Sequence, residues 1–446
     1  MTHRLIAAVL VLFIARAGAA QAVDFTGLDA VAAKELTERG VPGAAIAIVS
    51  GGRVVLAKGY GLANVETGAP MTPDLLIRLG STTKMFTAAA LLKLSDQGLI
   101  DLQTPISTYI KGLDPAVGRL TSHQLLSHTS GLLDEAPMYG SDDEAALLTN
   151  VLAWKADRFF TEPGAVYSYS NPGYWLAGAV IEAVSGKRYA DALNDTIFTV
   201  AGMTRTTLRP TVAMTHPLAL GHEVIANKPA VIRPFANNAM TWPAGSIFSS
   251  AADLSRFVTA FLGGGAIDGN QVLPPRVVAA LSTPSTKLPG GDGSYSYGLA
   301  IGDYGGARLI SHSGSRSGYG STIYMVPDRQ FGVIMVGNRS GASLPRTVDT
   351  AMQLGLGLKR AAPVTATMAP MTEKELAAYA GVYSQGRRKL EVIQRADKLY
   401  LKDERQESEL RRIGEHRFTA NVYFLIGPDG RASYLHSGGR SWRRIQ

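Results

Sequence analysis

The chain has 446 residues, of which 46% are hydrophobic and 18% charged, and its formal net charge is +8. This composition is typical of a folded globular protein, and the length favours two domains. The sequence contains no cysteine, which excludes disulfides, thiolate nucleophiles, cysteine-based zinc sites and lipidation of an amino-terminal cysteine. No run of eighteen apolar residues predicts a membrane-spanning helix.

The first 22 residues are typical of a secretory signal peptide. Arg4 precedes an apolar stretch over 5–14, and a run of small residues that ends at Ala22 follows it. We expect cleavage after Ala22, with Ala19 as the alternative, so the mature protein is expected to be periplasmic or secreted. The competing interpretation is a short amino-terminal helix of the mature fold.

The segment from 44 to 261 carries first strand signals and then helix signals. Two apolar runs, 44–49 and 54–57, flank Gly51-Gly52 and predict a β-hairpin. The four helices predicted after it are 81–98, ended by Gly98; a short helix to His128, opened by a capping box at Thr121–Gln124; 171–186, with Asn171 as cap before Pro172; and 250–261, with Asp253 in its first turn.

Strand signals return near the end of the first domain. Three short apolar runs follow one another at hairpin distance, at 308–310, 321–326 and 331–336. Strands at the beginning and the end, with helices between them, favour an α/β (α+β) domain over residues 23–360. We expect an antiparallel sheet flanked by helices and completed by both ends of the domain.

A change in composition marks a second domain. Residues 361–372 form a linker rich in Pro, Ala and Thr, and short alternating segments follow at 389–393, 421–426 and 431–435. They predict a small antiparallel β-barrel or sandwich over 373–446. This domain holds 15 Lys or Arg against 10 Asp or Glu, but no nucleic-acid motif accompanies them. A solvated basic face is therefore expected, and no nucleic-acid partner.

Ser81 and Lys84 are the first residues that suggest chemistry. They stand three positions apart at the start of a predicted helix, on one face, so that hydroxyl and amine can meet. A serine needs a base before it becomes a nucleophile, and a desolvated lysine with a lowered pKa can serve as that base. An S-x-x-K pattern alone is weak evidence, because a helix-capping serine followed by a solvent-exposed lysine gives the same pattern.

Two further motifs give the pattern its meaning. Tyr169-Ser170-Asn171 begins 88 residues after Ser81, and His312-Ser313-Gly314 begins 143 residues after Tyr169. In this order and spacing the three motifs resemble the serine β-lactamase and penicillin-binding-protein family, and within it the class C β-lactamase-like hydrolases. The stretches Leu125–Leu132 and Pro243–Ser246 agree with this resemblance, which spans about 28 to 357.

The resemblance implies roles for the first two motifs. Ser81 would form the acyl-enzyme, and Lys84 and Tyr169 would share the proton transfers, with Tyr169 as base for the deacylating water. A tyrosine could act as base only beside cations, because its ordinary pKa is near 10. Asn171 would bond Lys84 and the substrate amide, although a helix cap explains this asparagine equally well.

The third motif is implied to face the substrate. His312 stands where β-lactamases of this family usually carry lysine, so the resemblance favours the peptidase and esterase branches. Gly314 permits close backbone approach, and the N–H groups of Ser81 and Ser315 would form the oxyanion hole. Arg316 is placed to meet a substrate carboxylate. The competing interpretations are a core histidine and a surface arginine.

The expected function is that of an exported serine hydrolase that cleaves an ester, amide or lactam through a Ser81 acyl-enzyme. Carboxylesterase or D-peptidase specificity is favoured, with a β-lactamase proper and a non-turnover receptor for penicillin or peptidoglycan peptides as alternatives. No cofactor or metal is expected, because the histidines are scattered and no H-E-x-x-H motif occurs. The absence of a G-x-S-x-G motif argues against an α/β-hydrolase. No transmembrane anchor is expected after signal cleavage. Residues 373–446 resemble the lipocalin-like barrel often appended to such hydrolases, expected here to act as a lid or gate.

Overall fold

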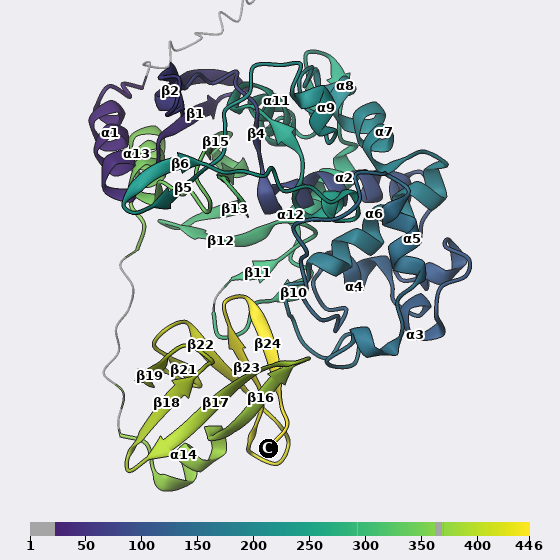
Figure 1. Ribbon diagram of the computed structural model, residues 1–446, viewed down its shortest axis with the longest axis vertical. Helices are drawn as coiled ribbons and strands as arrows, with labels where there is room; N and C mark the ends of the chain where they lie inside the picture. Colours follow the sequence, from purple (N-terminus) through teal and green to yellow (C-terminus); the bar gives the residue numbers. More distant parts are fainter. Residues whose placement is uncertain (1–22, 292, 362–367, 369) are drawn as a thin grey trace, which may run out of the picture.

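The computed structural model describes residues 23–446 apart from 292, 362–367 and 369 (Figure 1). The predicted signal peptide therefore lies outside the described residues, as does most of the predicted linker. None of the helices within the described ranges is both long enough and apolar enough to cross a bilayer.

An antiparallel sheet runs through the larger part of the molecule. Its strands, in spatial order, are β10 (Thr286–Lys287), β11 (Ser294–Tyr295), β12 (Ala300–Tyr304), β13 (Ala307–Arg316), β14 (Tyr319–Val326), β15 (Phe331–Gly337), β1 (Gly43–Ser50), β2 (Arg53–Asn64) and β3 (Ala69–Pro70). Ala44 of β1 lies opposite Gly337 of β15, so the first and last strands of this domain pair with each other. The prediction that both ends complete the sheet is confirmed.

The central strand β1 is buried on both faces. Ala44, Ile46 and Ile48 pack in one hydrophobic cluster, with residues of α1 (Gly27–Arg39) and α13 (Pro345–Leu356). The alternate residues of β1 pack in a second cluster, with α2 (Thr83–Asp96) and α11 (Ala251–Leu262). This alternation follows from the two-residue period of a strand, and it places helices on both sides of the sheet.

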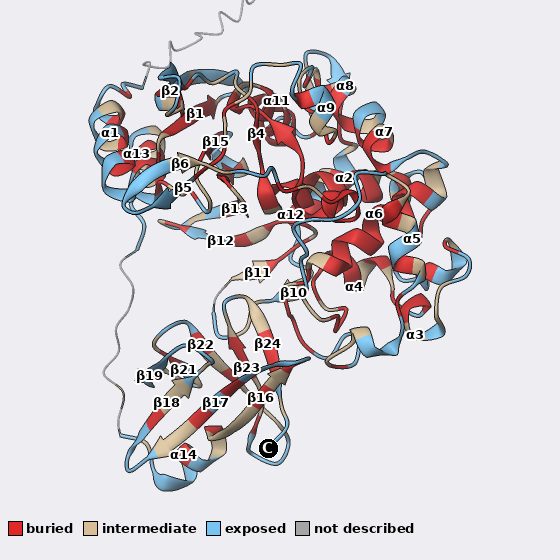
Figure 2. Cartoon of the chain, in the orientation of Figure 1, coloured by how far each residue is buried: buried red, intermediate tan, exposed pale blue. Residues whose placement is uncertain are grey.

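The helical part lies beside the sheet, toward the right of Figure 2. Its central helices are α2 and α6 (Asn171–Ser185), both largely buried. Around them lie α3 (Pro115–Gly118), α4 (Ser122–Leu126), α5 (Ala146–Leu152), α7 (Tyr189–Leu193), α8 (Thr199–Ala201), α9 (Pro210–Ala213), α10 (Trp242–Gly245) and α12 (Pro275–Ser282). The four predicted helices are present, and the capping box at Thr121–Gln124 is confirmed.

One predicted cap is wrong. The side chain that caps α6 belongs to Ser170, whose hydroxyl accepts a hydrogen bond from the N–H of Gly173 at 3.2 Å. Asn171 is the first residue of the helix, and its side chain is left to make other contacts. Serine caps at least as well as asparagine, so the local preference does not distinguish the two positions.

The carboxyl-terminal region forms a nearly closed antiparallel barrel after the short helix α14 (Glu373–Tyr379), as predicted. Its strands, in spatial order, are β19 (Glu407–Leu410), β18 (Lys398–Lys402), β17 (Arg388–Arg395), β16 (Gly381–Gln385), β24 (Arg440–Arg444), β23 (Ala432–Ser437), β22 (Val422–Ile426), β21 (Arg417–Phe418) and β20 (Arg412–Gly414). Aromatic side chains fill its core: Tyr379, Tyr383, Phe418, Phe424 and Trp442.

The barrel is joined to the hydrolase domain by hydrogen bonds from the hairpin β23–β24. The Tyr169 N–H donates to the Gly439 carbonyl at 2.9 Å. The Ser441 hydroxyl donates to the Tyr167 carbonyl at 2.8 Å, and its N–H donates to the Ser168 hydroxyl at 3.1 Å. The turn of this hairpin therefore lies beside the Tyr169 motif.

Candidate active site

Ser81 lies in a tight turn directly before α2. Gly80–Thr82 form a 3₁₀ turn, η1, so the predicted helix is α-helical only from Thr83. Gly80 has a φ of 59°, and a Cβ there would lie 2.5 Å from the N atom of Ser315. Only glycine allows this approach, which brings Ser81 against strand β13.

Lys84 contacts the nucleophile directly. Its Nζ lies 3.2 Å from Ser81 Oγ, 2.7 Å from Asn171 Oδ1 and 2.7 Å from the carbonyl oxygen of Ala244. A neutral amine has two N–H donors and one lone pair. The amide and carbonyl oxygens only accept and so take the two donors, which leaves the lone pair for the Ser81 proton.

The environment of Lys84 favours the uncharged amine. Its side chain is fully buried, and its three partners are uncharged oxygen atoms. Burial lowers the pKa of Lys84 well below its usual value; Asp134 acts in the opposite direction, and the guanidinium groups of Arg440 and Arg316 lower it further. A neutral amine beside a serine hydroxyl is the arrangement that general-base activation requires.

Tyr169 lies beside Lys84. Lys84 Nζ is 4.8 Å from the centre of the Tyr169 ring. Burial raises the pKa of Tyr169, and a hydrogen bond to Ser81 lowers it by less. The phenol is therefore protonated at neutral pH, and its hydroxyl can both donate and accept a proton beside Ser81.

His312 lines the same cleft as Ser81 and Tyr169, but both of its ring nitrogens contact the protein. Nδ1 lies 2.6 Å from the Ser313 carbonyl oxygen, which can only accept, so Nδ1 carries the proton. Nε2 then accepts from the Tyr295 hydroxyl at 3.2 Å. Burial lowers the pKa of His312 to about 3, and Lys84 lowers it in the same direction.

The hydrogen-bond chain continues to a second histidine. The Ser170 N–H donates to His128 Nδ1 at 3.0 Å, so the proton of this ring lies on Nε2. His128 Nε2 lies 3.2 Å from the Tyr295 hydroxyl oxygen, to which it donates. Each partner in this chain fixes the next, and both imidazoles are neutral with defined tautomers.

The motif strand β13 is longer than predicted and has an open edge. Its pairing with β12 ends at Ser311, opposite Ala300, whereas its pairing with β14 continues to Arg316. The segment with the H-x-G motif thus borders the cleft on one side. Gly314 is required there, because a Cβ would lie 1.8 Å from the carbonyl oxygen of Leu79. Ser81 and Ser315 both line this cleft, as the oxyanion-hole hypothesis requires.

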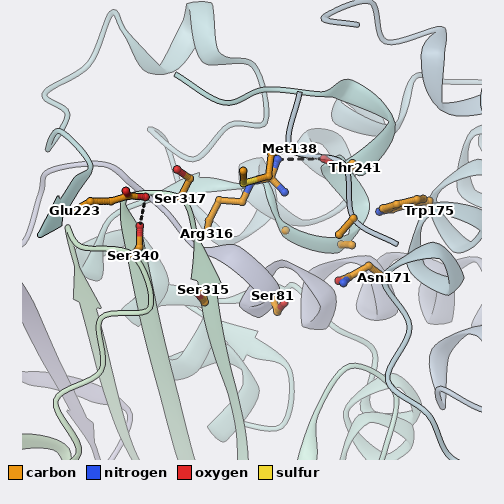
Figure 3. A pocket seen from close by; sticks show the side chains of 13 residues that line it. Ser81, Met138, Asn171, Trp175, Glu223, Thr241, Ser315, Arg316, Ser317 and Ser340 are labelled. Atoms are coloured by element: carbon orange, nitrogen blue, oxygen red, sulfur yellow. Dashed lines mark hydrogen bonds between the residues drawn. The ribbon is translucent and has the colours of Figure 1, made fainter. Parts of the chain in front are cut away.

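Arg316 enters the cleft from the end of β13 and lines it together with Ser81 and Ser315 (Figure 3). Its Nη2 donates to the Thr241 hydroxyl at 3.2 Å, while its Nε is buried and has no hydrogen-bond partner among the described residues. Burial lowers the pKa of Arg316 to about 10, so it remains a cation at neutral pH. Glu223 and Ser340 line the same cleft, with a hydrogen bond of 3.2 Å between them.

The structure brings together all of the predicted site residues, and it adds three that the sequence analysis did not identify. Tyr295 orients His312. Asp134 accepts from the N–H and from Nδ2 of Asn171, at 2.8 and 3.0 Å. Arg440, from the barrel, forms an ion pair with Asp134. The only sequence signal for Arg440 was the turn residues Gly438-Gly439 before it, which are common in hairpins.

Comparison with known proteins agrees with this geometry. A family model described as Beta-lactamase matches residues 28–356. Penicillin-binding protein 4 of Amycolatopsis lactamdurans is 31% identical over 311 residues, which cover 65% of this chain and 79% of that protein. Protein flp of Staphylococcus aureus (strain NCTC 8325 / PS 47) is 26% identical over 335 residues, which are 72% of this chain; the match spans 64% of the relative's length.

Among solved structures, the crystal structure of SurE with D-Leu is similar over both domains. It has a TM-score of 0.75 and 27% identity, and the match covers 94% of this chain and 99% of that one. The resemblance inferred from the three motifs is thereby confirmed at the level of the family. Because the family model covers well over half of the sequence, the chain belongs to the β-lactamase family of serine hydrolases, together with class C β-lactamases and penicillin-binding proteins.

Proposed function

We propose that this protein is an exported serine hydrolase that cleaves esters or amides through an acyl-enzyme on Ser81, with carboxylesterase or D-peptidase specificity. The observation that carries the proposal is the contact of 3.2 Å between Ser81 Oγ and Nζ of Lys84, a buried amine whose pKa is lowered by burial. The signal peptide predicted over residues 1–22 supports the proposal of a periplasmic or secreted location.

Acylation follows from this contact. Ser81 Oγ attacks the substrate carbonyl carbon while its proton passes to Lys84 Nζ, and the N–H groups of Ser81 and Ser315 bind the developing oxyanion. The leaving amine or alkoxide takes a proton from the Lys84 ammonium through the Tyr169 hydroxyl. In the second half of the reaction, water attacks the acyl carbonyl carbon while its proton passes through the Tyr169 hydroxyl to Lys84. The Lys84 ammonium then returns a proton to Ser81 Oγ, which releases the acid and restores the enzyme.

The role of Tyr169 in this scheme differs from that of a phenolate base. Its raised pKa disfavours ionisation, and Lys84 has the lone pair that the reaction needs. We therefore assign proton abstraction to Lys84 and proton relay to the neutral Tyr169 hydroxyl.

Substrate preference is proposed from two residues of β13 that line the cleft at different positions along the strand. His312 is neutral, so the side where β-lactamases place a lysine lacks a cation. Arg316, four residues along β13, is a cation that also lines the cleft. A substrate carboxylate in the cleft would pair with the Arg316 guanidinium, which favours D-peptides with a free carboxyl terminus and acidic esters.

Replacing Arg316 should reduce the preference for anionic substrates. In Arg316→Gln, kcat/KM for acetyl-D-Ala-D-Ala should fall by about tenfold or more, because a charge-assisted hydrogen bond is lost. Hydrolysis of the matched carboxamide, acetyl-D-Ala-D-Ala-NH₂, should change little. Arg329→Gln, which removes an exposed arginine in the turn before β15, is the control. Equal losses on both peptides would contradict a carboxylate site at Arg316.

A lysine at position 312 should shift specificity toward β-lactams. The His312 side chain is 9% exposed on the cleft wall, so the longer lysine can extend its ammonium into the cleft. In His312→Lys, the ratio of kcat/KM for nitrocefin to that for p-nitrophenyl acetate should rise by about tenfold. Thermal melts measured beside the kinetics provide the control. A sharply lowered Tm with unchanged specificity would show that His312 serves the core instead.

A substrate panel tests the proposed function as a whole. Protein lacking residues 1–22 is assayed with p-nitrophenyl esters, D-Ala-D-Ala peptides, D-amino-acid amides and nitrocefin. Turnover of the ester or D-peptide with little nitrocefin hydrolysis is the expected result. Fast nitrocefin hydrolysis would identify a β-lactamase proper. A fluorescent penicillin that labels Ser81 and is not released, with no turnover of any substrate, would identify a non-turnover receptor.

A further inference from the structure

The turn between β23 and β24 of the barrel lies at the wall of the active-site cleft. Gly438, Gly439 and Arg440 line it together with Ser81 and His312. The Arg440 guanidinium carbon lies 5.4 Å from the centre of the Tyr169 ring. The carboxyl-terminal barrel therefore reaches the reacting residues of the hydrolase domain.

Arg440 forms an ion pair with Asp134. Its Nε donates to Asp134 Oδ2 at 2.7 Å, and its Nη2 donates to the same oxygen. The Asp134 side chain is 3% exposed, so its charge is almost fully removed from water. A carboxylate buried to this extent needs a cation beside it, and Arg440 supplies that cation from the other domain.

The second oxygen of Asp134 fixes the amide of Asn171. Oδ1 accepts from Asn171 Nδ2 at 3.0 Å, and a carboxylate can only accept, so the amide nitrogen must face Asp134. Asn171 Oδ1 then faces Lys84 Nζ at 2.7 Å. With the amide reversed, an N–H₂ group would face Lys84 and compete for the lone pair that Ser81 needs.

We propose that Arg440 is a positioning residue for catalysis: by holding Asp134, it orients the Asn171 amide and keeps the lone pair of Lys84 directed at Ser81. The barrel thus completes the catalytic site, beyond any role as a lid. The inference rests on the proposed hydrolysis through Ser81.

The same contacts give Arg440 an electrostatic effect. Asp134 without its partner would favour the protonated form of Lys84, because an anion raises the pKa of a nearby amine. Arg440 opposes this effect of Asp134. The charged or titratable groups that face Lys84 are Asp134, Arg440, Arg316, His128, His312, Tyr169 and Tyr174.

The test compares pH profiles of variants on both sides of the ion pair. kcat/KM for p-nitrophenyl acetate is measured across the acid limb, where Lys84 gains its proton and activity is lost. In Arg440→Gln the limb should move to higher pH, and kcat at pH 7 should fall on the order of 10- to 100-fold as the amine is misaligned. In Asp134→Asn the limb should move to lower pH, because Arg440 then acts on Lys84 without compensation.

Two further variants distinguish the effect of the Arg440 charge from the effect of its hydrogen-bond geometry, and both from a general loss of barrel stability. Arg440→Lys keeps the charge without the guanidinium, so its limb should stay near that of the wild type while the plateau falls. Arg443→Gln removes an exposed arginine three residues along β24 and should leave the profile unchanged. Titration of the Lys84 signal by NMR with ¹³C-labelled lysine reports the same pKa directions without turnover.

Opposite shifts in Arg440→Gln and Asp134→Asn would support the inference. The inference would be overturned if the acid limb and the Lys84 titration stayed at their wild-type positions in both variants. If Arg440→Gln fails to fold, Asp134→Asn decides the question alone. A wild-type enzyme that is not acylated at Ser81 would contradict the proposed function, and the NMR titration would still test the position of Arg440.

Discussion

Ser81→Ala is expected to abolish acylation, with a loss of turnover on the order of 10³-fold or more, the scale seen when a nucleophile is removed. The hydroxyl is the atom that bonds the substrate, and its nearest base is Lys84 Nζ at 3.2 Å. Ser81 is only partly buried, so its replacement by alanine should leave the fold intact. The measurement is single-turnover kinetics on the best substrate of the panel.

Mass spectrometry locates the nucleophile independently. After incubation with a phosphonate ester or a β-lactam, the adduct should lie on the peptide that contains Ser81 and be missing from Ser81→Ala. Thermal melts of the two proteins should coincide, which excludes a folding defect. An adduct on another serine, or unaltered turnover in the variant, would refute the assignment.

Lys84→Arg is expected to fail nearly as badly as Lys84→Ala. Arginine keeps a positive charge but does not release its proton in proteins, so it cannot accept the proton of Ser81. In the wild type, activity should persist at pH values well below the usual pKa of lysine, because burial lowers the pKa of Lys84. As the pH falls through that lowered pKa the amine becomes charged, and kcat/KM should fall with it.

Lys84→Met provides the matched control for folding. At neutral pH an unfolded lysine is protonated, so burying Lys84 as a neutral amine costs free energy, and methionine of similar volume avoids that cost. The variant should be inactive with a Tm equal to or above that of the wild type. Near-wild-type activity in Lys84→Arg would show that the lysine supplies only positive charge.

The sequence was sufficient to predict most of the fold. The strands at both ends of the hydrolase domain and the helices between them follow from local apolar periodicity, and the barrel follows from alternation after a linker. The cap of α6 was wrong, because Ser170 and Asn171 have similar local preferences and only the contacts of Asn171 with Lys84 and Asp134 distinguish them.

The catalytic motifs could be predicted from the sequence, whereas the residues that position them could not. Ser81, Lys84, Tyr169 and His312 stand in short patterns with a fixed order along the chain. Asp134, Tyr295 and Arg440 have no such pattern, since each acts through a contact formed only in the folded protein; Arg440 and Asp134 are 306 residues apart. The tautomer of His312 likewise depends on Tyr295 and Ser313 and cannot be read from residue type.

The pairing of β1 with β15 has a consequence for how the chain folds. The Gly43 N–H donates to the Asn338 side chain at 2.8 Å, a contact between residues 295 positions apart. The hairpin β1–β2 must therefore wait, with one edge of its apolar first strand unpaired, until almost the whole hydrolase domain is available. Such long-range closure slows folding, and an open strand edge invites association with other chains. Fragments that end before residue 331 should accordingly aggregate rather than fold.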